Sequence, residues 1–117
     1  MANFGFILSR SPNAGRNLHT LYNLALAALR KNHKVFIYLC YDGIYSPIKN
    51  QRQVDGSKNP REMIGDLIQK GAEVICSELD TRVRGIDGSK TFIEGIKIGN
   101  LPDLAEAVSR IDRLITL

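Results

Sequence analysis

The sequence predicts one α/β domain over residues 1–117, built on a doubly wound, mostly parallel sheet of about five strands flanked by helices. The first observation is that short continuous apolar runs, typical of strands buried on both faces, alternate with segments whose apolar residues recur at helical spacing. The second is that the 117 residues contain no internal repeat, low-complexity tract or linker, and a chain of this length usually forms a single domain. Elements that alternate in this way are joined by right-handed crossovers, which make neighbouring strands parallel.

The strands are predicted from four apolar runs. The first two, FGFIL and VFIYLCY, are continuous, and the second stops at Asp42-Gly43, a turn-forming pair. The third run, VIC, ends at Cys76, and LITL follows near the end of the sequence. These runs occupy residues 4–8, 35–41, 74–76 and 114–117. Because ligands bind outside the carboxyl ends of strands in open parallel sheets, a site is expected in the segments that follow them.

The first two helices are predicted from apolar spacing and from signals at their ends. One begins at Leu18 and ends near Lys31-Asn32-His33, where a basic last turn suits the helix dipole. The other has an N-cap at Asn59, a proline and a capping-box glutamate behind it, and a closing glycine at Gly71. Between the second strand and this helix, residues 43–59 are polar and predict a long loop.

The last helix is predicted to begin at a cap on Asn100. Two short helical turns are expected before it, at residues 80–84 and 89–94. The residues expected to form the buried face of the last helix are Leu101, Leu104, Ala105, Val108 and Ile111.

Composition narrows the class of protein. The chain is 44% hydrophobic and 24% charged, as in ordinary soluble globular proteins. The opening MANFGFILSR lacks a cleavage site for a signal peptide, and no apolar run reaches the length that a membrane span needs. We therefore expect a cytoplasmic protein without a membrane partner.

The net charge of +4 is unevenly spread. Residues 1–61 carry nine Lys and Arg against two acids, and residues 62–117 carry seven against ten. A basic half suits an acidic partner or RNA, but a solvated surface is the simpler reading. The absence of a nucleic-acid recognition motif argues against direct nucleic-acid binding.

No cofactor or metal is expected. The loop at residues 9–17, SRSPNAGRN, matches neither of the glycine-rich phosphate-binding patterns, so a capped loop is favoured over a nucleotide site. Neither cysteine stands at metal-ligand spacing from His19 or His33.

The two cysteines differ in their setting. Cys40 lies inside an apolar run, which favours a core residue. Cys76 ends its strand, where Arg82 and Arg84 would favour a reactive thiolate, whereas the neighbouring Glu78 and Asp80 oppose it. From the residues alone, a reactive Cys76 and a buried Cys76 are equally supported.

Three segments in order carry a resemblance to a known family. They are VFIYLCYDG, KGAEVICSELDTRVRGI with its cysteine eight or nine residues before Arg84-Gly85, and the ending IKIGNLPDLAEAVSRIDRLITL. Together they resemble the DsrE/DsrF/TusD-like proteins of sulfur relay along nearly the full length. This sequence has Ser77-Glu78-Leu79-Asp80 where some relatives place a second cysteine. Its interval from Cys76 to Arg84-Gly85 is one residue longer than in TusD-like sequences.

The resemblance implies a small DsrE-like subunit that assembles into homotrimers or hexamers and carries sulfur as a persulfide on one cysteine. Cys76 matches that cysteine by position, with Arg82 and Arg84 supporting the thiolate or a partner and with Asp42 and Gly43 lining the neighbouring strand end. The implied partner is a small sulfur-carrier protein of the TusA type. No cofactor is implied.

Two functional hypotheses follow. In the first, the chain is a sulfur-relay subunit, with sulfurtransferase as its implied activity, in which Cys76 takes sulfur from a donor and surrenders it to an acceptor thiolate. In the second, it is a non-catalytic homo-oligomeric DsrE-like protein, a scaffold or small-ligand binder, in which Cys76 is a structural core residue. Whether the chain is an enzyme is left open.

Overall fold

The computed structural model describes residues 1–52 and 58–117 and contains one five-stranded parallel sheet. The strand order is β4-β3-β2-β1-β5, and each neighbouring pair is parallel. This confirms the predicted fold class, with a sheet that is parallel throughout. The strands are β1 (Asn3–Leu8), β2 (Lys34–Leu39), β3 (Glu73–Ser77), β4 (Ile96–Gly99) and β5 (Arg113–Thr116).

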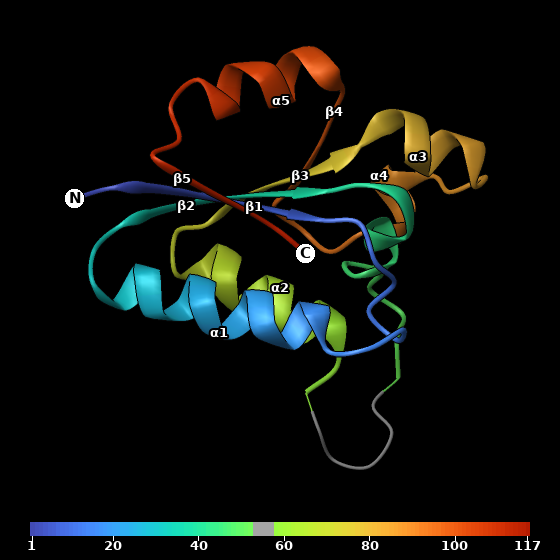
Figure 1. The fold of residues 1–117 in the computed structure, drawn as a ribbon. Coiled ribbons are helices and arrows are strands. Elements are labelled where there is room, and N and C mark those ends of the chain that lie inside the picture. The colour runs from blue at the N-terminus through green and yellow to red at the C-terminus, as the bar shows by residue number, and fades with distance from the viewer. Residues whose placement is uncertain (53–57) are drawn as a thin grey trace.

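Helices cover both faces of the sheet (Figure 1). Two of them, α1 and α2, lie side by side on one face, and α5 lies on the other. The short α3 and α4 stand at the end of the sheet toward which the strands run (Figure 1). The helical elements are α1 (Asn17–Arg30), the 3₁₀ helix η1 (Tyr41–Tyr45), α2 (Pro60–Gln69), α3 (Glu78–Val83), α4 (Gly88–Thr91) and α5 (Leu101–Val108).

The end signals of α2 act as predicted. Asn59 accepts a hydrogen bond from the Glu62 amide at 3.1 Å, and Pro60 occupies the first helical position. Gly71 follows the helix with φ of 108°, a conformation that side chains other than glycine rarely adopt. These local signals make the boundaries of α2 readable from sequence.

Three other predictions need correction. The second strand ends at Leu39, because Cys40 and Tyr41 turn out of the sheet into η1. The strand β4 was not predicted, since IKIG is short and polar at every second position. The predicted loop at residues 43–59 contains most of η1, and its residues 53–57 lie outside the described part of the chain.

The buried face of α5 also differs from the prediction. Leu101 is 72% exposed, and Ala105 and Val108 are exposed as well. Leu104 and Ile111 meet the sheet as predicted, and Ala107 joins them in the buried stripe. The helix therefore rests on the sheet by a narrow edge, and its other apolar residues face outward.

The core is divided by the sheet into two clusters. The larger lies beneath α1 and α2 and includes Phe6, Ile37 and Leu67. The smaller lies on the α5 side and is built from Phe36, Tyr38, Cys40, Ile75 and Ala107. Within the described ranges, no helix is both long enough and apolar enough to cross a membrane.

Candidate functional site

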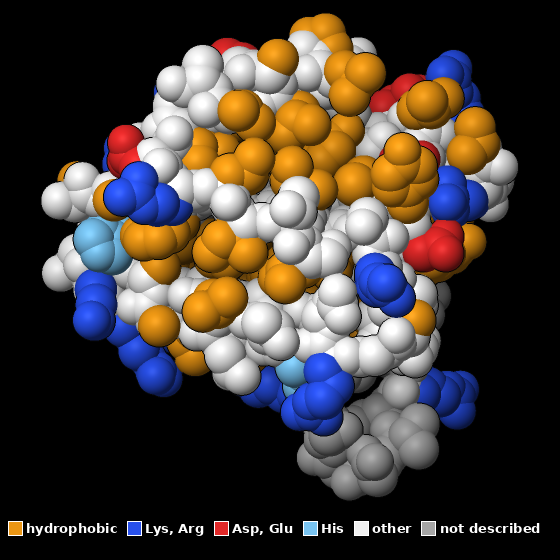
Figure 2. Space-filling view, in the orientation of Figure 1, with side chains coloured by type: hydrophobic (Ala, Val, Ile, Leu, Met, Phe, Trp, Pro, Cys, Tyr) orange, Lys and Arg blue, Asp and Glu red, His pale blue; other side chains and the backbone are white. Residues whose placement is uncertain are grey.

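A groove of about 660 Å³ opens at the carboxyl edge of the sheet, on the α5 side. Its apolar walls come from the start of α3 and the start of α5, and Figure 2 shows hydrophobic side chains gathered on this face of the molecule. Its polar groups come from the end of β3 at Ser77, from α3 and from the cap of α5 at Asn100. The residues that matter for its chemistry are Cys40, Ser77, Asp80, Leu79, Leu101 and Leu104.

Cys76 lies on the other face of the sheet from this groove. Its backbone is in register with Leu39 of β2 and Ile98 of β4, and it belongs to the core cluster beneath α1 and α2. The residue is 0% exposed. Burial raises the pKa of the Cys76 thiol far above its ordinary value, because the apolar surroundings disfavour the thiolate. In this conformation the thiol is protonated and out of reach of solvent.

Cys40 is the thiol that lines the groove. It follows β2 on the α5 side, is 9% exposed, and its Sγ lies 3.8 Å from the carbonyl oxygen of Leu8. Burial, with a smaller effect of the Asp80 carboxylate, raises its pKa to about 11. The pairing of Leu39 with Cys76 explains why the two thiols face opposite ways, since neighbours in register share a face and successive residues alternate.

Arg84 connects α3 to the segment that follows β2. Its guanidinium donates to Asp42 Oδ1 from Nη2 at 3.0 Å and from Nε at 3.3 Å. It also donates from Nη1 to the carbonyl oxygen of Asp80 at 3.1 Å and to Asp80 Oδ1 at 3.4 Å. The hydrogen bond to Asp42 raises the pKa of Arg84. The structure thus brings the predicted residues Asp42 and Arg84 together, with Asp80 as a third member.

The other predicted residues have separate roles. Arg82 is exposed and pairs with Glu78 at 3.5 Å, so its charge is directed along α3. Gly43 lies where a Cβ would collide with the carbonyl group of Leu8, so the close approach of η1 to β1 requires glycine. Arg82 and Arg84 both contact carboxylates, and Cys76 lies in the core rather than beside a free cation.

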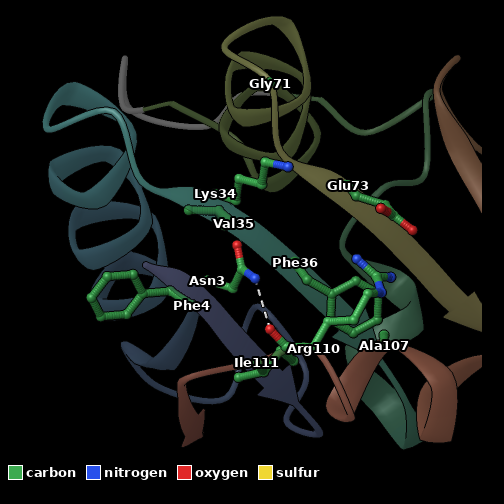
Figure 3. Close-up of a pocket in the computed structure, with 10 residues that line it drawn as sticks. All are labelled: Asn3, Phe4, Lys34, Val35, Phe36, Gly71, Glu73, Ala107, Arg110 and Ile111. Atoms are coloured by element: carbon green, nitrogen blue, oxygen red, sulfur yellow. Dashed lines mark hydrogen bonds between the residues drawn. The ribbon is translucent and has the colours of Figure 1, made fainter. Parts of the chain in front are cut away.

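A smaller cavity, of about 180 Å³, lies at the amino edge of the sheet (Figure 3). The Asn3 side-chain amide donates to the carbonyl oxygen of Arg110 at 2.7 Å, and the Arg110 guanidinium binds Glu106 at 2.9 and 3.0 Å. The first contact fastens the turn after α5 to β1, and the second joins this turn to α5 itself. The cavity therefore marks how α5 is anchored, whereas the two cysteines lie toward the opposite edge of the sheet.

The geometry defines a class of protein: a small doubly wound α/β domain with two cysteines near the carboxyl edge of a parallel sheet. The sequence model of the DsrE/DsrF-like family matches residues 2–117. The chain belongs to this family, which is of the sulfur-relay type.

Individual proteins are similar to the chain along most of its length. An uncharacterized protein of Methanopyrus kandleri is 30% identical over 109 residues, which cover 93% of this chain and 88% of the relative. The crystal structure of the YchN protein from E. coli superposes with a TM-score of 0.90 at 24% identity and covers 100% of both chains. A protein of unknown function from Methanobacterium thermoautotrophicum superposes with a TM-score of 0.73 at 10% identity, over 98% of this chain and 99% of its own. These structural likenesses establish the fold.

Proposed function

We propose that this protein is a sulfur-relay subunit that carries sulfur as a persulfide on Cys76 and exchanges it with a small sulfur-carrier protein of the TusA type. The observation that carries the proposal is the place of Cys76, at the carboxyl end of the interior strand β3 in a chain of the DsrE/DsrF-like family. Carboxyl ends of parallel strands are where α/β proteins place their chemistry.

The proposed transfer is a thiol–persulfide exchange. The Cys76 thiolate attacks the outer sulfur of a donor persulfide, a new S–S bond forms on Cys76, and the donor leaves as its own thiolate. An acceptor thiolate later attacks the outer sulfur on Cys76 in the same way and releases the Cys76 thiolate. Atoms and electrons balance in both steps without a cofactor.

Burial sets a condition on this chemistry. A thiolate is the nucleophile in sulfur exchange, and the closed site keeps Cys76 protonated. Transfer therefore requires an opening of the carboxyl edge that admits the donor and hydrates the thiol.

The test is to load the protein with a polysulfide donor and measure its intact mass. Wild type and Cys40→Ser should gain the mass of one sulfur atom that a reductant removes, and Cys76→Ser should not. Cys40→Ser is the matched control because it removes the other thiol of the chain. A mass gain that persists in Cys76→Ser and disappears in Cys40→Ser would show that the persulfide forms on Cys40. This outcome would refute the proposal for Cys76.

A second candidate function rests on the 0% exposure of Cys76. In that case the chain is a non-catalytic homo-oligomeric DsrE-like protein, a scaffold or small-ligand binder, and Cys76 only fills the core. It predicts no reducible mass gain in wild type and alkylation of Cys76 only when the whole protein unfolds.

A further inference from the structure

We propose that Arg84, Asp42 and Asp80 form a clasp that holds α3 closed over the carboxyl end of β3, and that Cys76 becomes reactive when this clasp opens. The inference rests on the proposed function, since it concerns access to the same thiol. It assigns Arg84 a positioning role: its guanidinium closes the site instead of activating the sulfur.

Apolar burial does little to hold α3 in place. Of its six residues, all of them described, only Thr81 is buried. Its large apolar side chains point outward, with Leu79 56% and Val83 66% exposed. A short helix that buries little apolar surface belongs to the least stable parts of a fold, so its position depends on polar contacts.

Polar contacts join α3 to η1. Arg84 immediately follows α3 and reaches Asp42 in η1 at 3.0 Å, while it also binds Asp80 within α3. Asp80 in turn accepts a hydrogen bond from the Tyr41 amide at 2.8 Å. Tyr41 has φ of 48°, a left-handed conformation that is unfavourable for tyrosine, so the bond to Asp80 holds a strained turn in place. The clasp therefore joins α3 to η1 at two adjacent residues.

The elements joined by the clasp stand at the end of the strand that carries Cys76. Ser77, the next residue, is the N-cap of α3, and α3 packs against both β3 and η1. Ile44 of η1 and Cys76 belong to the same buried cluster. Separation of α3 from η1 therefore opens the cluster at the end that contains Cys76.

The ends of α3 are suited to such a movement. Ser77 is the cap at its start, and Gly85, with φ of 70°, follows Arg84 at its end. Hinges are commonly a few residues at the ends of elements that absorb changes in backbone angles. We infer that α3 moves as a unit about these two residues.

The test measures the alkylation of Cys76 by iodoacetamide at about pH 8.5, where ordinary thiols react readily. A Cys40→Ser background makes Cys76 the only thiol in the chain. In this background Arg84→Gln should speed alkylation about fivefold or more, because it removes two partly buried ion pairs and several charged hydrogen bonds. The alkylation rate of Arg84→Lys should fall between those of the Cys40→Ser parent and Arg84→Gln, since an ammonium group cannot bind both carboxylates with the geometry of the guanidinium.

The matched control is Arg110→Gln in the same background. Arg110 also binds a carboxylate through two hydrogen bonds, but it does so with Glu106 at the other edge of the sheet. This control should leave the alkylation rate of Cys76 unchanged. Because the clasp is partly exposed, an increase from about 0.1 M to about 1 M sodium chloride should also speed alkylation in the parent and have a smaller effect in Arg84→Gln.

Global unfolding must be separated from local opening. The free energy of unfolding of each variant gives the increase in alkylation rate that global exposure of Cys76 would produce. If the clasp exists, the measured rate increase in Arg84→Gln is larger than this value. Equal alkylation rates in Arg84→Gln and Arg110→Gln would overturn the clasp, as would an increase fully accounted for by global unfolding. Alkylation uses no sulfur donor, so it tests the clasp independently of the persulfide assay. A negative persulfide assay refutes the proposed function but not the clasp, and a negative alkylation assay refutes the clasp but not the proposed function.

Discussion

At the scale of single residues, the two thiols of this chain are close in the sheet and chemically separate. Leu39 is paired with Cys76, so Cys40, one residue later, faces the opposite side. Thiols whose Cβ bonds point apart cannot form a disulfide without backbone movement. A persulfide on either thiol must therefore be resolved by an external thiol.

The position of these residues could be predicted from sequence, but their faces could not. The end of a strand is visible where VIC gives way to SELD. The face is not visible because residues 35–39 of β2 and 74–76 of β3 form continuous apolar runs, so no alternation distinguishes the α5 side from the α1 and α2 side. The register between β2 and β3 decides it, and register depends on the packing of the whole sheet.

The raised pKa of Cys40 predicts a loss of stability at high pH. Below about pH 8 the thiol is protonated in both folded and unfolded chains, so it has no effect. As the pH rises from about 8.5 toward the folded-state pKa of about 11, the unfolded chain loses the proton first and unfolding becomes easier. Each pH unit in this window costs up to about 1.4 kcal/mol.

Urea unfolding of wild type and Cys40→Ser between pH 7 and pH 10 checks this prediction. The curve of free energy against pH should be flatter in Cys40→Ser, by about 1 to 2 kcal/mol at pH 10. Cys76 is present in both proteins, so its own titration cancels in the difference. Parallel curves would show that the Cys40 thiol titrates normally in the folded protein.

At the scale of elements, local signals and tertiary packing differ in what they reveal. The boundaries of α2 follow from Asn59, Pro60 and Gly71, each of which acts on the adjacent backbone. The orientation of α5 does not follow from its own sequence, because apolar residues surround more of the helix than the sheet can cover. The structure buries the stripe with Ala107 and leaves Leu101 exposed.

The contact between η1 and β1 gives a prediction at this scale. Gly43→Ala should destabilise the protein by about 1 to 3 kcal/mol, because the new methyl group collides with the carbonyl group of Leu8 and the backbone must move. Gly65→Ala is the matched control: its Cβ would lie 3.6 Å from the nearest atom of Ile93, an ordinary contact, inside the helix α2.

Thermal and urea unfolding of both variants measure the difference. Gly65→Ala should be neutral or more stable by up to about 1 kcal/mol, since alanine favours a helix interior. Equal stability of Gly43→Ala and wild type would mean that η1 does not press against β1 in solution.

At the scale of the whole molecule, the arrangement leaves apolar surface uncovered on the α5 side (Figure 2). The strand order places β5 at an edge of the sheet, where its outer backbone groups are free to pair, and Leu114 in β5 is 46% exposed. Leu101 and Val108 of α5 are also exposed on this side. Exposed apolar surface beside an open edge strand is typical of an interface between copies.

The resulting prediction is that the chain forms a homo-oligomer, a trimer or a hexamer. Light scattering at micromolar concentration should give a mass that is a multiple of the 13.0 kDa of the chain. Leu114→Glu should shift the distribution toward the single chain, because a carboxylate placed in an apolar interface must be desolvated. Val83→Glu on α3 is the control, since it changes an exposed apolar residue away from β5 by the same chemistry. A single-chain mass for wild type would contradict the prediction. In that case the open edge of β5 is protected from pairing by the shortness of the strand and by the exposed charge of Arg113.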